Sequence, residues 1–360
     1  MDTASKSPGQ HQAQSKPDET SGNVGEGPTD KLGRSLRDLR ISVTDRCNFR
    51  CTYCMPREVF GPEYQFLSRD QVLSFEEIRR LARLFVSAGV EKIRLTGGEP
   101  LLRREIEKLV AMLADLDGVR DLTMTTNASL LAAKAPALSE AGLQRVTVSL
   151  DALDDEVFRA ISDVQIPIET VLQGIAAAKE VGLTPIKVNM VVKRGVNEDQ
   201  ILKMSEYFRG SGHVLRFIEF MDVGNSNGWR LEDVVSGREI RDTIHVRWPL
   251  EPVEPNYPGE VARRYRYQDG SGEIGIITSV TQPFCSTCNR ARLTADGELF
   301  TCLFARQGHD LKELVRGGAD DREISARIRA VWDERTDRYS EIRSLSTIDL
   351  PRVEMSRIGG

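Results

Sequence analysis

Residues 41–54 read ISVTDRCNFRCTYC, a β-branched run followed by three closely spaced cysteines, Cys47, Cys51 and Cys54. The run is typical of a buried strand, so we expect the thiols on the loop that leaves it. Three thiolates on one short loop can bind three corners of an iron–sulfur cubane and leave the fourth iron without a protein ligand. Such an open iron is a binding site for a small molecule, as the vacant position on catalytic zinc is.

Two other interpretations of this triplet remain open, a structural zinc site and a disulfide. Zinc would need a fourth ligand, yet none of the four histidines of the chain is near this loop in sequence. A disulfide would leave one thiol of the triplet unpaired. We therefore interpret the three cysteines as cluster ligands.

A second triplet, Cys285, Cys288 and Cys302, contains the remaining cysteines of the chain. Its spacing alone also allows a structural cluster, or a zinc site with His309 as a conceivable fourth ligand. Two complete four-thiolate sites would need more cysteines than the chain has. The simplest division is therefore two three-cysteine clusters, each with an open iron.

Around the first triplet, short β-branched runs alternate with longer amphipathic stretches as far as about Asn225. One helix is expected to begin at Ser74, which forms a capping-box pattern with Glu77. Six strand–helix units imply a parallel sheet, either open and doubly wound or an incomplete barrel. In both folds the chemistry belongs at the carboxyl ends of the strands. The expected strands are 39–43, 92–95, 121–125, 145–150, 186–192 and 214–218.

Polar residues and glycines stand at these strand ends, where a site is expected. Gly97-Gly98-Glu99-Pro100 follows the second strand. Its glycines would let the backbone approach a ligand closely, although a Gly-Gly pair alone is usually just a turn. The other strand ends carry Thr44, Thr125-Thr126-Asn127, Ser149, Asp151, Glu219 and Met221.

Composition limits what the molecule can be. The chain has 360 residues and 49 Lys and Arg against 54 Asp and Glu, a net charge of −5, which excludes a polybasic binder of nucleic acid. No apolar run is long enough to span a bilayer, and the first residues lack the pattern of a secretory signal. We therefore expect a cytoplasmic protein with no membrane partner.

Three regions are expected along the chain: a disordered tail at 1–33, the strand–helix units at 34–228 and a smaller C-terminal region at 229–360. The tail is poor in apolar residues and cannot build a core. Within the C-terminal region we expect a loop at the proline-rich stretch 249–258, a strand at 273–278 and helices near 311–315 and 323–332.

Basic residues lie in or beside the expected strands rather than on polar helix faces. Arg290 and Arg292 are two apart on an expected strand, so they share one face beside the second triplet. Guanidinium groups suit bidentate contact with phosphate. Buried charges are costly unless paired, so the set indicates a polyanionic substrate, although ion pairs with nearby carboxylates would explain some members. The other basic residues are Arg40, Arg94, Lys187 and Arg216, and the carboxylates are Glu99, Asp151 and Glu219.

The first triplet, with Tyr53 before its last cysteine, and the Gly-Gly turn resemble the radical S-adenosylmethionine superfamily. Within it the chain resembles one family, the GTP 3′,8-cyclases of molybdenum cofactor biosynthesis, from about Leu36 to Gly360. The resemblance rests on residues 41–47, 92–100, 216–221, the second triplet and the terminal MSRIGG at 355–360. It implies an α/β fold, an incomplete (β/α)6 TIM-like barrel with a smaller C-terminal region that carries a second iron–sulfur cluster.

The same resemblance implies the cofactors and the reaction. Each triplet would hold a [4Fe-4S] cluster, S-adenosylmethionine would bind the first cluster, and the guanine of GTP would meet the open iron of the second. Reductive cleavage of S-adenosylmethionine would give a 5′-deoxyadenosyl radical, which takes hydrogen from ribose C3′ before the carbon radical attacks guanine C8. The implied product is 3′,8-cyclo-7,8-dihydro-GTP.

Residue roles are implied by position. The terminal Gly359 and Gly360 would support catalysis in the pocket, together with Arg290 and Arg292. The S-adenosylmethionine contacts would be Tyr53, Gly98, Ser149 and Met221. The GTP contacts would be Arg40, Arg94, Thr125, Lys187, Arg290, Ala291 and Arg292.

The implied partners are a reducing electron donor and, downstream, molybdenum cofactor biosynthesis protein C; a homodimer is compatible with the resemblance. Two alternatives remain open. A radical S-adenosylmethionine enzyme that modifies peptides would tend to carry more auxiliary cysteines and a peptide-recognition domain. A non-catalytic iron–sulfur protein would have four ligands per site and no cationic pocket.

Overall fold

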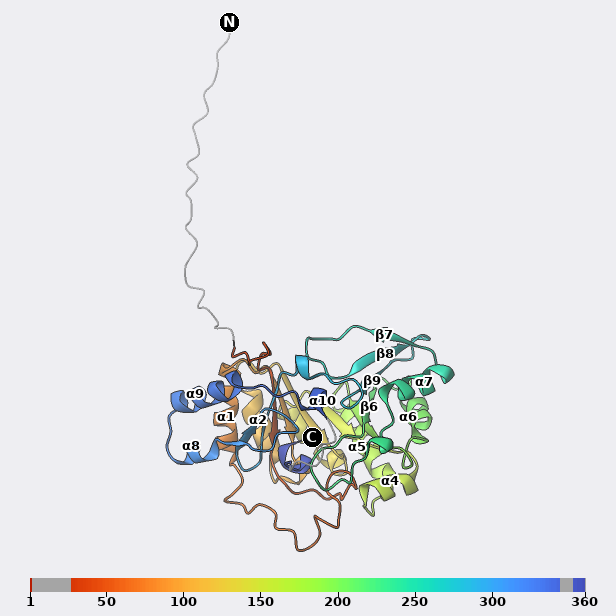
Figure 1. Cartoon of the computed structure of the whole chain (residues 1–360), viewed down its shortest axis with the longest axis horizontal. Helices are drawn as coiled ribbons and strands as arrows, with labels where there is room; N and C mark the ends of the chain where they lie inside the picture. Colours follow the sequence, from red (N-terminus) through yellow and green to blue (C-terminus); the bar gives the residue numbers. More distant parts are fainter. Residues whose placement is uncertain (2–26, 344–351, 360) are drawn as a thin grey trace.

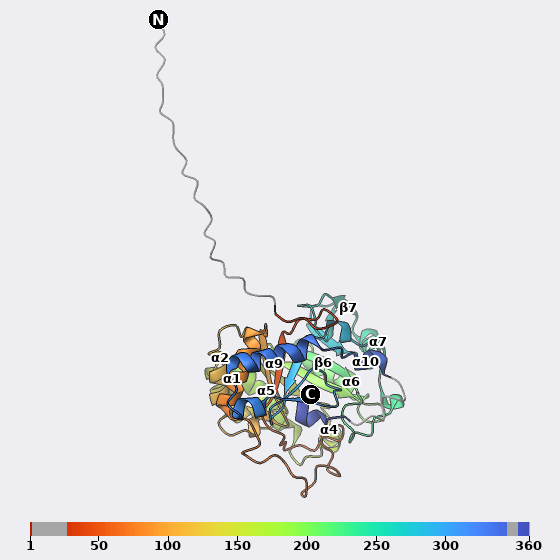
Figure 2. The same cartoon turned by 60° about the vertical axis from the view of Figure 1, so that its left-hand side comes forward.

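Twelve β-strands form one sheet in the computed structural model, which describes residues 1, 27–343 and 352–359. Figures 1 and 2 show helices packed along the outside of this sheet, with α9 alongside α1. The strands are β1 (Asp38–Ser42), β2 (Lys92–Thr96), β3 (Asp121–Thr126), β4 (Arg145–Ser149), β5 (Lys187–Val192), β6 (Val214–Glu219), β7 (Leu250–Val253), β8 (Arg263–Tyr267), β9 (Glu273–Ile277), β10 (Arg290–Leu293), β11 (Glu298–Phe300) and β12 (His309–Asp310).

The helices alternate with the first six strands and then become irregular. They are α1 (Phe75–Ser87), α2 (Ile106–Ala114), α3 (Leu131–Glu140), α4 (Asp155–Ser162), α5 (Ile168–Glu180), α6 (Gln200–Phe208), α7 (Gly237–Arg247), α8 (Lys312–Arg316), α9 (Asp321–Asp333), α10 (Tyr339–Ile342) and α12 (Met355–Ile358). Short 3-10 helices lie at Pro100–Leu102, Leu231–Asp233 and Cys285–Thr287.

The sheet has the strand order β12-β11-β10-β1-β2-β3-β4-β5-β6-β9-β8-β7. Strands β1 to β6 pair in sequence order and in parallel, which confirms the incomplete (β/α)6 barrel. The C-terminal region extends it at both edges, because β10 pairs in parallel with β1 and β9 in parallel with β6. The sheet is therefore continuous across the expected region boundary near residue 228.

The local signals in the sequence explain where the first elements begin. The expected capping box is present, because Glu77 N donates to Ser74 Oγ at 3.1 Å and Ser74 N donates to Glu77 Oε2 at 2.7 Å. Helix α1 then buries one face through Ile78, Leu81 and Phe85. The capping box thus sets where α1 begins, and the apolar face sets which side of the helix packs on the core.

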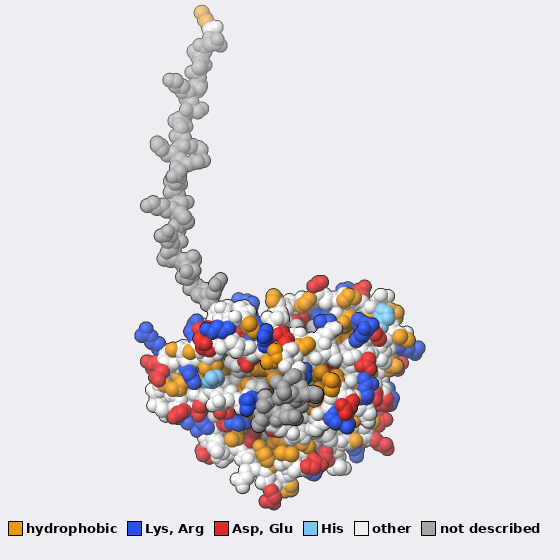
Figure 3. Space-filling model, viewed as in Figure 1, with side chains coloured by type: hydrophobic (Ala, Val, Ile, Leu, Met, Phe, Trp, Pro, Cys, Tyr) orange, Lys and Arg blue, Asp and Glu red, His pale blue; other side chains and the backbone are white. Residues whose placement is uncertain are grey.

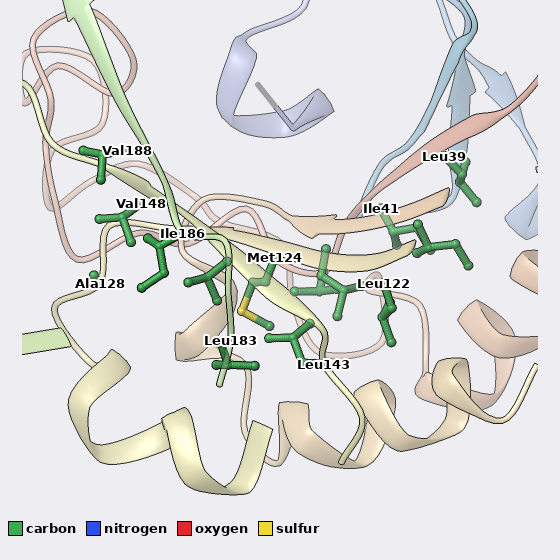
Figure 4. Packing of buried hydrophobic residues seen from close by; sticks show 14 of the residues in the cluster. Leu39, Ile41, Leu122, Met124, Ala128, Leu143, Val148, Leu183, Ile186 and Val188 are labelled. Carbon is green, nitrogen blue, oxygen red and sulfur yellow. The ribbon is translucent and has the colours of Figure 1, made fainter. Parts of the chain in front are cut away.

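The core lies between the sheet and its surrounding helices. Figure 4 shows Leu122 and Met124 of β3 and Leu143, just before β4, pointing into this layer. Leu39 and Ile41 of β1 are fully buried there as well. Since successive side chains of a strand point to opposite faces, the alternate residue Arg40 faces the barrel interior. Strand β1 thus buries apolar residues outside and presents a polar one inside.

Two expectations are wrong. The stretch 249–258, expected as loop, contains strand β7, because Leu250–Val253 pairs antiparallel with β8; its proline, Pro252, is on the edge strand, where a missing N–H is tolerated. The disorder expected for 1–33 does not extend to residues 27–33, where Asp30 is buried. Residues 2–26 lie outside the described part of the chain.

On the face that Figure 3 shows, basic and acidic side chains are interspersed. Over the described residues, no helix combines the length and apolarity needed to cross a bilayer.

Candidate active site

Both cysteine triplets line the same cavity, which encloses about 280 Å³ over the carboxyl ends of the barrel strands. Most of the residues expected at the site are brought together there. Those that line it are Arg40, Cys47, Cys51, Tyr53, Cys54, Arg94, Gly98, Thr125, Ser149, Met221, Cys285, Cys288, Arg290, Arg292 and Cys302. Segments separated by more than two hundred residues in sequence therefore build one chamber.

The first triplet is held on a tight loop after β1. Cys54 N and Met55 N both donate to the Cys51 carbonyl at 2.9 Å. Arg50 Nη1 donates to the Cys47 carbonyl at 2.8 Å, and Phe49 N donates to Cys47 Sγ at 3.4 Å. These bonds orient the thiols before any ligand binds.

The thiols of this loop need a cation to ionise. Burial, reinforced by nearby Glu99, raises the pKa of Cys47 to about 11. Burial and the neighbouring thiols raise the pKa of Cys51 well above its usual value as well. A thiolate is the form that binds metal, so a bound metal centre would supply the positive charge that this loop requires.

The Gly-Gly turn after β2 packs against the cluster loop itself. A Cβ on Gly98 would lie 2.2 Å from the Arg46 carbonyl oxygen, and one on Gly97 would lie 2.5 Å from that of Thr44. Gly98 N donates to the Thr44 carbonyl at 2.8 Å. The glycines therefore let two loops approach each other, in addition to the close approach to a ligand that the sequence predicts.

The three carboxylates at the strand ends do not neutralise the basic residues. Glu99 accepts hydrogen bonds from Leu101 N, Thr126 Oγ1 and Asn127 N. Asp151 accepts from Tyr53 Oη at 2.7 Å and from Val191 N at 2.8 Å. Glu219 accepts from three backbone amides and the Thr281 hydroxyl. Among the described residues none of the three forms an ion pair, so this alternative explanation of the cations fails.

The second triplet lies in a more positive environment. Arg290 Nη2 and Arg335 Nη2 donate to Cys288 Sγ at 3.1 and 3.2 Å. Burial opposes ionisation of Cys288, but the two guanidinium groups outweigh it and lower the pKa to about 6. By contrast, burial and Asp337 raise the pKa of Cys302 to about 12. One thiolate of this triplet is thus already stabilised by the protein.

The donor sets fit iron–sulfur clusters. All six cysteines are free thiols, which argues against disulfides. His309, the conceivable zinc ligand, contacts Arg327 and does not line the cavity. Among the described residues no three His, Cys, Asp or Glu side chains converge on one ion. A cubane does not require that convergence, because each thiolate binds a different iron.

A row of cations crosses the floor of the cavity. Arg292 of β10, Arg40 of β1 and Arg94 of β2 are register partners on neighbouring strands. Burial and mutual repulsion lower the pKa of Arg40 well below its usual value, and that of Arg292 to about 10. The Nε atoms of Arg40, Arg94 and Arg290 are buried without a hydrogen-bond partner among the described residues. This excess of unpaired positive charge suits a polyphosphate.

Two expected substrate residues do not line the cavity. Lys187 is half-buried on β5 beside its register partner Thr147, whose hydroxyl accepts from Arg94 Nη1 at 3.0 Å. Burial and nearby Arg216 lower the pKa of Lys187 to about 7. The Ala291 side chain is fully buried, because it alternates with Arg290 and Arg292 along β10. Any contact of Ala291 with a ligand would therefore have to go through its backbone.

The C-terminal tail reaches the same chamber. Met355 and Ser356 line the cavity, and Arg292 Nη1 donates to the carbonyls of Ile358 and Gly359. Gly359 has φ +67°, and a Cβ there would meet Thr96 Cγ2 at 2.4 Å, so only glycine fits. Gly360 lies outside the described residues.

Further residues at the site were not expected from the sequence. Asn189 of β5 lines the cavity, and its Oδ1 accepts from Arg216 Nε at 2.9 Å. Its place two residues after Lys187 on one strand was a usable signal. Arg34 and Arg335 also line the cavity, but no local pattern marks either residue.

A parallel barrel with an open-iron triplet after its first strand defines a radical S-adenosylmethionine enzyme. The radical S-adenosylmethionine superfamily model matches residues 41–208, and the Molybdenum Cofactor Synthesis C model matches residues 213–341. The chain is 58% identical to GTP 3′,8-cyclase of Acidothermus cellulolyticus over 92% of this chain and 94% of that protein. The corresponding proteins of Xanthomonas campestris and Staphylococcus carnosus are 53% and 49% identical, over 92% of this chain and 97% and 98% of theirs.

The chain therefore belongs to the GTP 3′,8-cyclase family. Among solved structures, methylornithine synthase aligns with a TM-score of 0.46 and 18% identity, over 60% of this chain and 63% of that chain, a similarity that adds nothing to this assignment.

Proposed function

We propose that this protein converts GTP to 3′,8-cyclo-7,8-dihydro-GTP, the first step of molybdenum cofactor biosynthesis, with S-adenosylmethionine and two [4Fe-4S] clusters. The observation that carries the proposal is the single cavity lined by two three-cysteine loops and a row of unpaired cations. Family membership supplies the reaction class, and the cavity supplies a physical reason for each requirement of the reaction. When bound, the first cluster and S-adenosylmethionine provide one electron and a hydrogen-abstracting organic radical.

Residues around the first triplet would hold the sulfonium cofactor. Cys47, Cys51 and Cys54 would bind the first cluster, and Tyr53, Gly98, Ser149 and Met221 would contact S-adenosylmethionine. The hydrogen bond from Tyr53 to Asp151 fixes the aromatic side chain at this end of the site. Asn127 contacts the cluster loop, since its Nδ2 lies 3.9 Å from Cys47 Sγ, and Glu99 fixes Asn127 by accepting a hydrogen bond from its backbone N.

The cations would hold the substrate. Arg40, Arg94, Arg290 and Arg292, which line the cavity, would bind the triphosphate, with Thr125 and the Ala291 backbone beside them. Lys187, which does not line the cavity in the free protein, would extend its side chain from β5 to join them. Cys285, Cys288 and Cys302 would hold the cluster that meets guanine. A nucleotide held at both ends keeps its ribose fixed, and this positioning lets C3′ and C8 react in one orientation. The buried cations are worth more than exposed ones because little water screens them.

The wider setting of the reaction belongs to the same proposal. The product would pass to molybdenum cofactor biosynthesis protein C, and a reducing protein would supply electrons, in the cytoplasm. A homodimer is compatible with this proposal.

The first test is 5′-deoxyadenosine formation by anaerobically reconstituted protein with dithionite and S-adenosylmethionine, with and without GTP, followed by mass analysis of the nucleotide. We expect GTP-dependent formation and a cyclised product. Formation that is indifferent to GTP would move the substrate toward peptides. No formation despite a full iron content would favour a non-catalytic role.

The phosphate assignment has its own test in Arg292→Ala. Loss of one charge-assisted contact should raise the KM for GTP by about 10- to 100-fold, because such hydrogen bonds are worth about 1.5–3 kcal/mol. The first cluster should remain intact by its absorption and iron content. Unchanged GTP affinity and turnover, in this variant and in Arg290→Ala, would contradict the assignment.

A further inference from the structure

A buried network of two arginines and one aspartate contacts the second triplet. None of the three is among the residues expected to bind the clusters, S-adenosylmethionine or GTP. Arg335 follows α9 and Arg34 precedes β1, and both contact Asp30. The Asp30, Arg34 and Arg335 side chains are 0%, 3% and 1% exposed. No role has been given to these residues by the sequence pattern or by the proposed mechanism.

The network holds the backbone and the sulfur of the cluster loop. Arg335 Nη1 donates to the Cys288 carbonyl at 2.7 Å, while its Nη2 donates to Cys288 Sγ at 3.2 Å. Arg34 Nη1 donates to the Cys285 carbonyl at 2.7 Å. Two of the three cysteines are thereby fixed by groups that are remote from them in sequence.

Arg335 is itself fixed in place. Its guanidinium stacks on the Trp332 ring at 4.6 Å, and Trp332 Nε1 donates to the Arg34 carbonyl at 2.9 Å. Asp30 Oδ2 accepts hydrogen bonds from Arg34 Nε at 2.6 Å and from Arg335 Nη1 at 3.1 Å. A donor held this rigidly can act on one sulfur without losing side-chain entropy when the cluster binds.

The three fully buried side chains of the network carry a net positive charge, because two guanidinium groups share the one carboxylate of Asp30. Asp337 pairs with Arg335 Nε at 3.4 Å, but its side chain is 30% exposed, so water screens its charge. Arg34 Nη2 is buried without a hydrogen-bond partner among the described residues. The remaining positive charge faces the second triplet, where an anionic cluster would compensate it.

We infer that Arg335, held by Asp30 and Trp332, is a positioning residue that raises the reduction potential of the second cluster and slows its loss. The inference rests on the proposed function, because it takes Cys285, Cys288 and Cys302 as cluster ligands. Hydrogen bonds to cluster sulfurs and nearby positive charge favour the reduced, more negative state, so their removal lowers the potential.

The test isolates the second cluster in a parent protein with Cys47, Cys51 and Cys54 replaced by alanine. In this parent the midpoint potential is measured by redox titration followed by electron paramagnetic resonance, and iron loss is measured as the rate of release to a chelator. Arg335→Gln should lower the potential and release iron several-fold faster. Arg335→Lys retains the charge and should shift the potential less. Asp30→Asn frees the guanidinium and should also release iron faster.

Asp222→Asn is the matched control. Asp222 is equally buried and also binds two arginines, Arg343 and Arg352, but its described contacts include no cysteine. We expect its potential and iron release to equal those of the parent. If Arg335→Gln had the same potential and iron-release rate as Asp222→Asn, the inference would be overturned while the cluster assignment stood. Should Arg335→Gln fail to fold, the same result in both Arg335→Lys and Asp30→Asn would overturn it. A parent that binds no cluster would overturn both.

Discussion

Lys187 illustrates how single buried charges prepare this cavity for an anion. It forms no ion pair among the described residues, and its neighbours Arg216, Arg145, Lys92 and Arg94 all carry positive charge. The acidic Asp121 nearby is already paired with Arg145 and Lys92. In the free protein Lys187 is therefore partly neutral near pH 7, and a bound polyphosphate would favour its protonated form.

This arrangement predicts a pH dependence of GTP binding. With a pKa of about 7 in the free protein, Lys187 is protonated at pH 6 and mostly neutral at pH 8. A bound triphosphate raises the pKa, so binding takes up a proton above pH 7 and GTP affinity should fall by roughly tenfold per pH unit there. Titration calorimetry with GTP in buffers of different ionisation enthalpy measures both effects. Lys187→Arg should bind GTP with little pH dependence, and an unchanged slope in that variant would assign the proton to another group.

The thiol ligands act at the same scale. Cys47→Ser removes one of only three protein ligands of the first cluster, so iron should fall from about eight to about four per chain, and 5′-deoxyadenosine formation should drop to background. Cys285→Ser is the matched control, since it should lose a similar amount of iron yet still cleave S-adenosylmethionine. A normal 5′-deoxyadenosine yield from Cys47→Ser would exclude this loop as the site of cleavage.

Among the elements, the Gly-Gly turn after β2 and the cluster loop after β1 depend on each other. Gly98 cannot carry a side chain, because its Cβ would overlap the Arg46 carbonyl next to Cys47. Gly98→Ala should therefore displace the first cluster loop and destabilise the fold by about 1–3 kcal/mol, as overpacking does. Iron content and thermal unfolding measure the two effects.

Gly182→Ala provides the control for this substitution. Gly182 has φ +81°, but a Cβ there would meet nothing within 4 Å. It should cost only the backbone strain, about 1 kcal/mol, and leave the cluster intact. Equal cluster loss in both variants would mean that general destabilisation, and not contact with the loop, releases the iron.

The elements also show what a sequence can predict. The expected strand 92–95 and the observed β2, Lys92–Thr96, differ by one residue, because β-branched runs and strand-end polar residues are local signals. Strand β7 was missed because the prolines of 249–258 suggested a loop, whereas an edge strand tolerates them. The Asp30–Arg335 contact joins residues 305 apart, and the composition around Asp30 is that of a tail. Such contacts leave no periodic trace in the sequence.

For the whole molecule, the continuous sheet makes the two triplets parts of one rigid chamber. Strand β10 places Arg290 and Arg292 directly beside β1, the strand that leads to the first cluster. The C-terminal tail closes the arrangement, and in its described part it is anchored through Arg352, Glu354 and Arg357. The Glu354 carboxylate accepts hydrogen bonds from Asn225 N and the Ser226 hydroxyl. Arg357 Nη2 forms ion pairs with Asp296 at 2.8 Å and Glu298 at 2.6 Å.

The anchor at Arg357 is expected to matter for the rate of cyclisation and little for the stability of the fold. Its side chain is 42% exposed, so its ion pairs should contribute less than about 1 kcal/mol to folding. The same pairs fix the register of Ile358 and Gly359 against Arg292, and a displaced catalytic contact lowers rates far more than stability. Arg357→Ala should thus lower the rate of cyclisation by about tenfold or more while 5′-deoxyadenosine formation without productive cyclisation persists.

Arg194→Ala is the matched comparison for Arg357→Ala, because Arg194 pairs with Glu239 at a similar 45% exposure and does not line the cavity. Its cyclisation rate should equal that of the parent, and both variants should unfold at nearly the same temperature. If Arg357→Ala cyclised GTP at the parent rate while removal of Gly359 and Gly360 abolished cyclisation, the other contacts of the tail, at Arg292, Arg352 and Glu354, would be enough to hold it in the chamber. If both retained full rates, the tail would have no part in positioning the substrate.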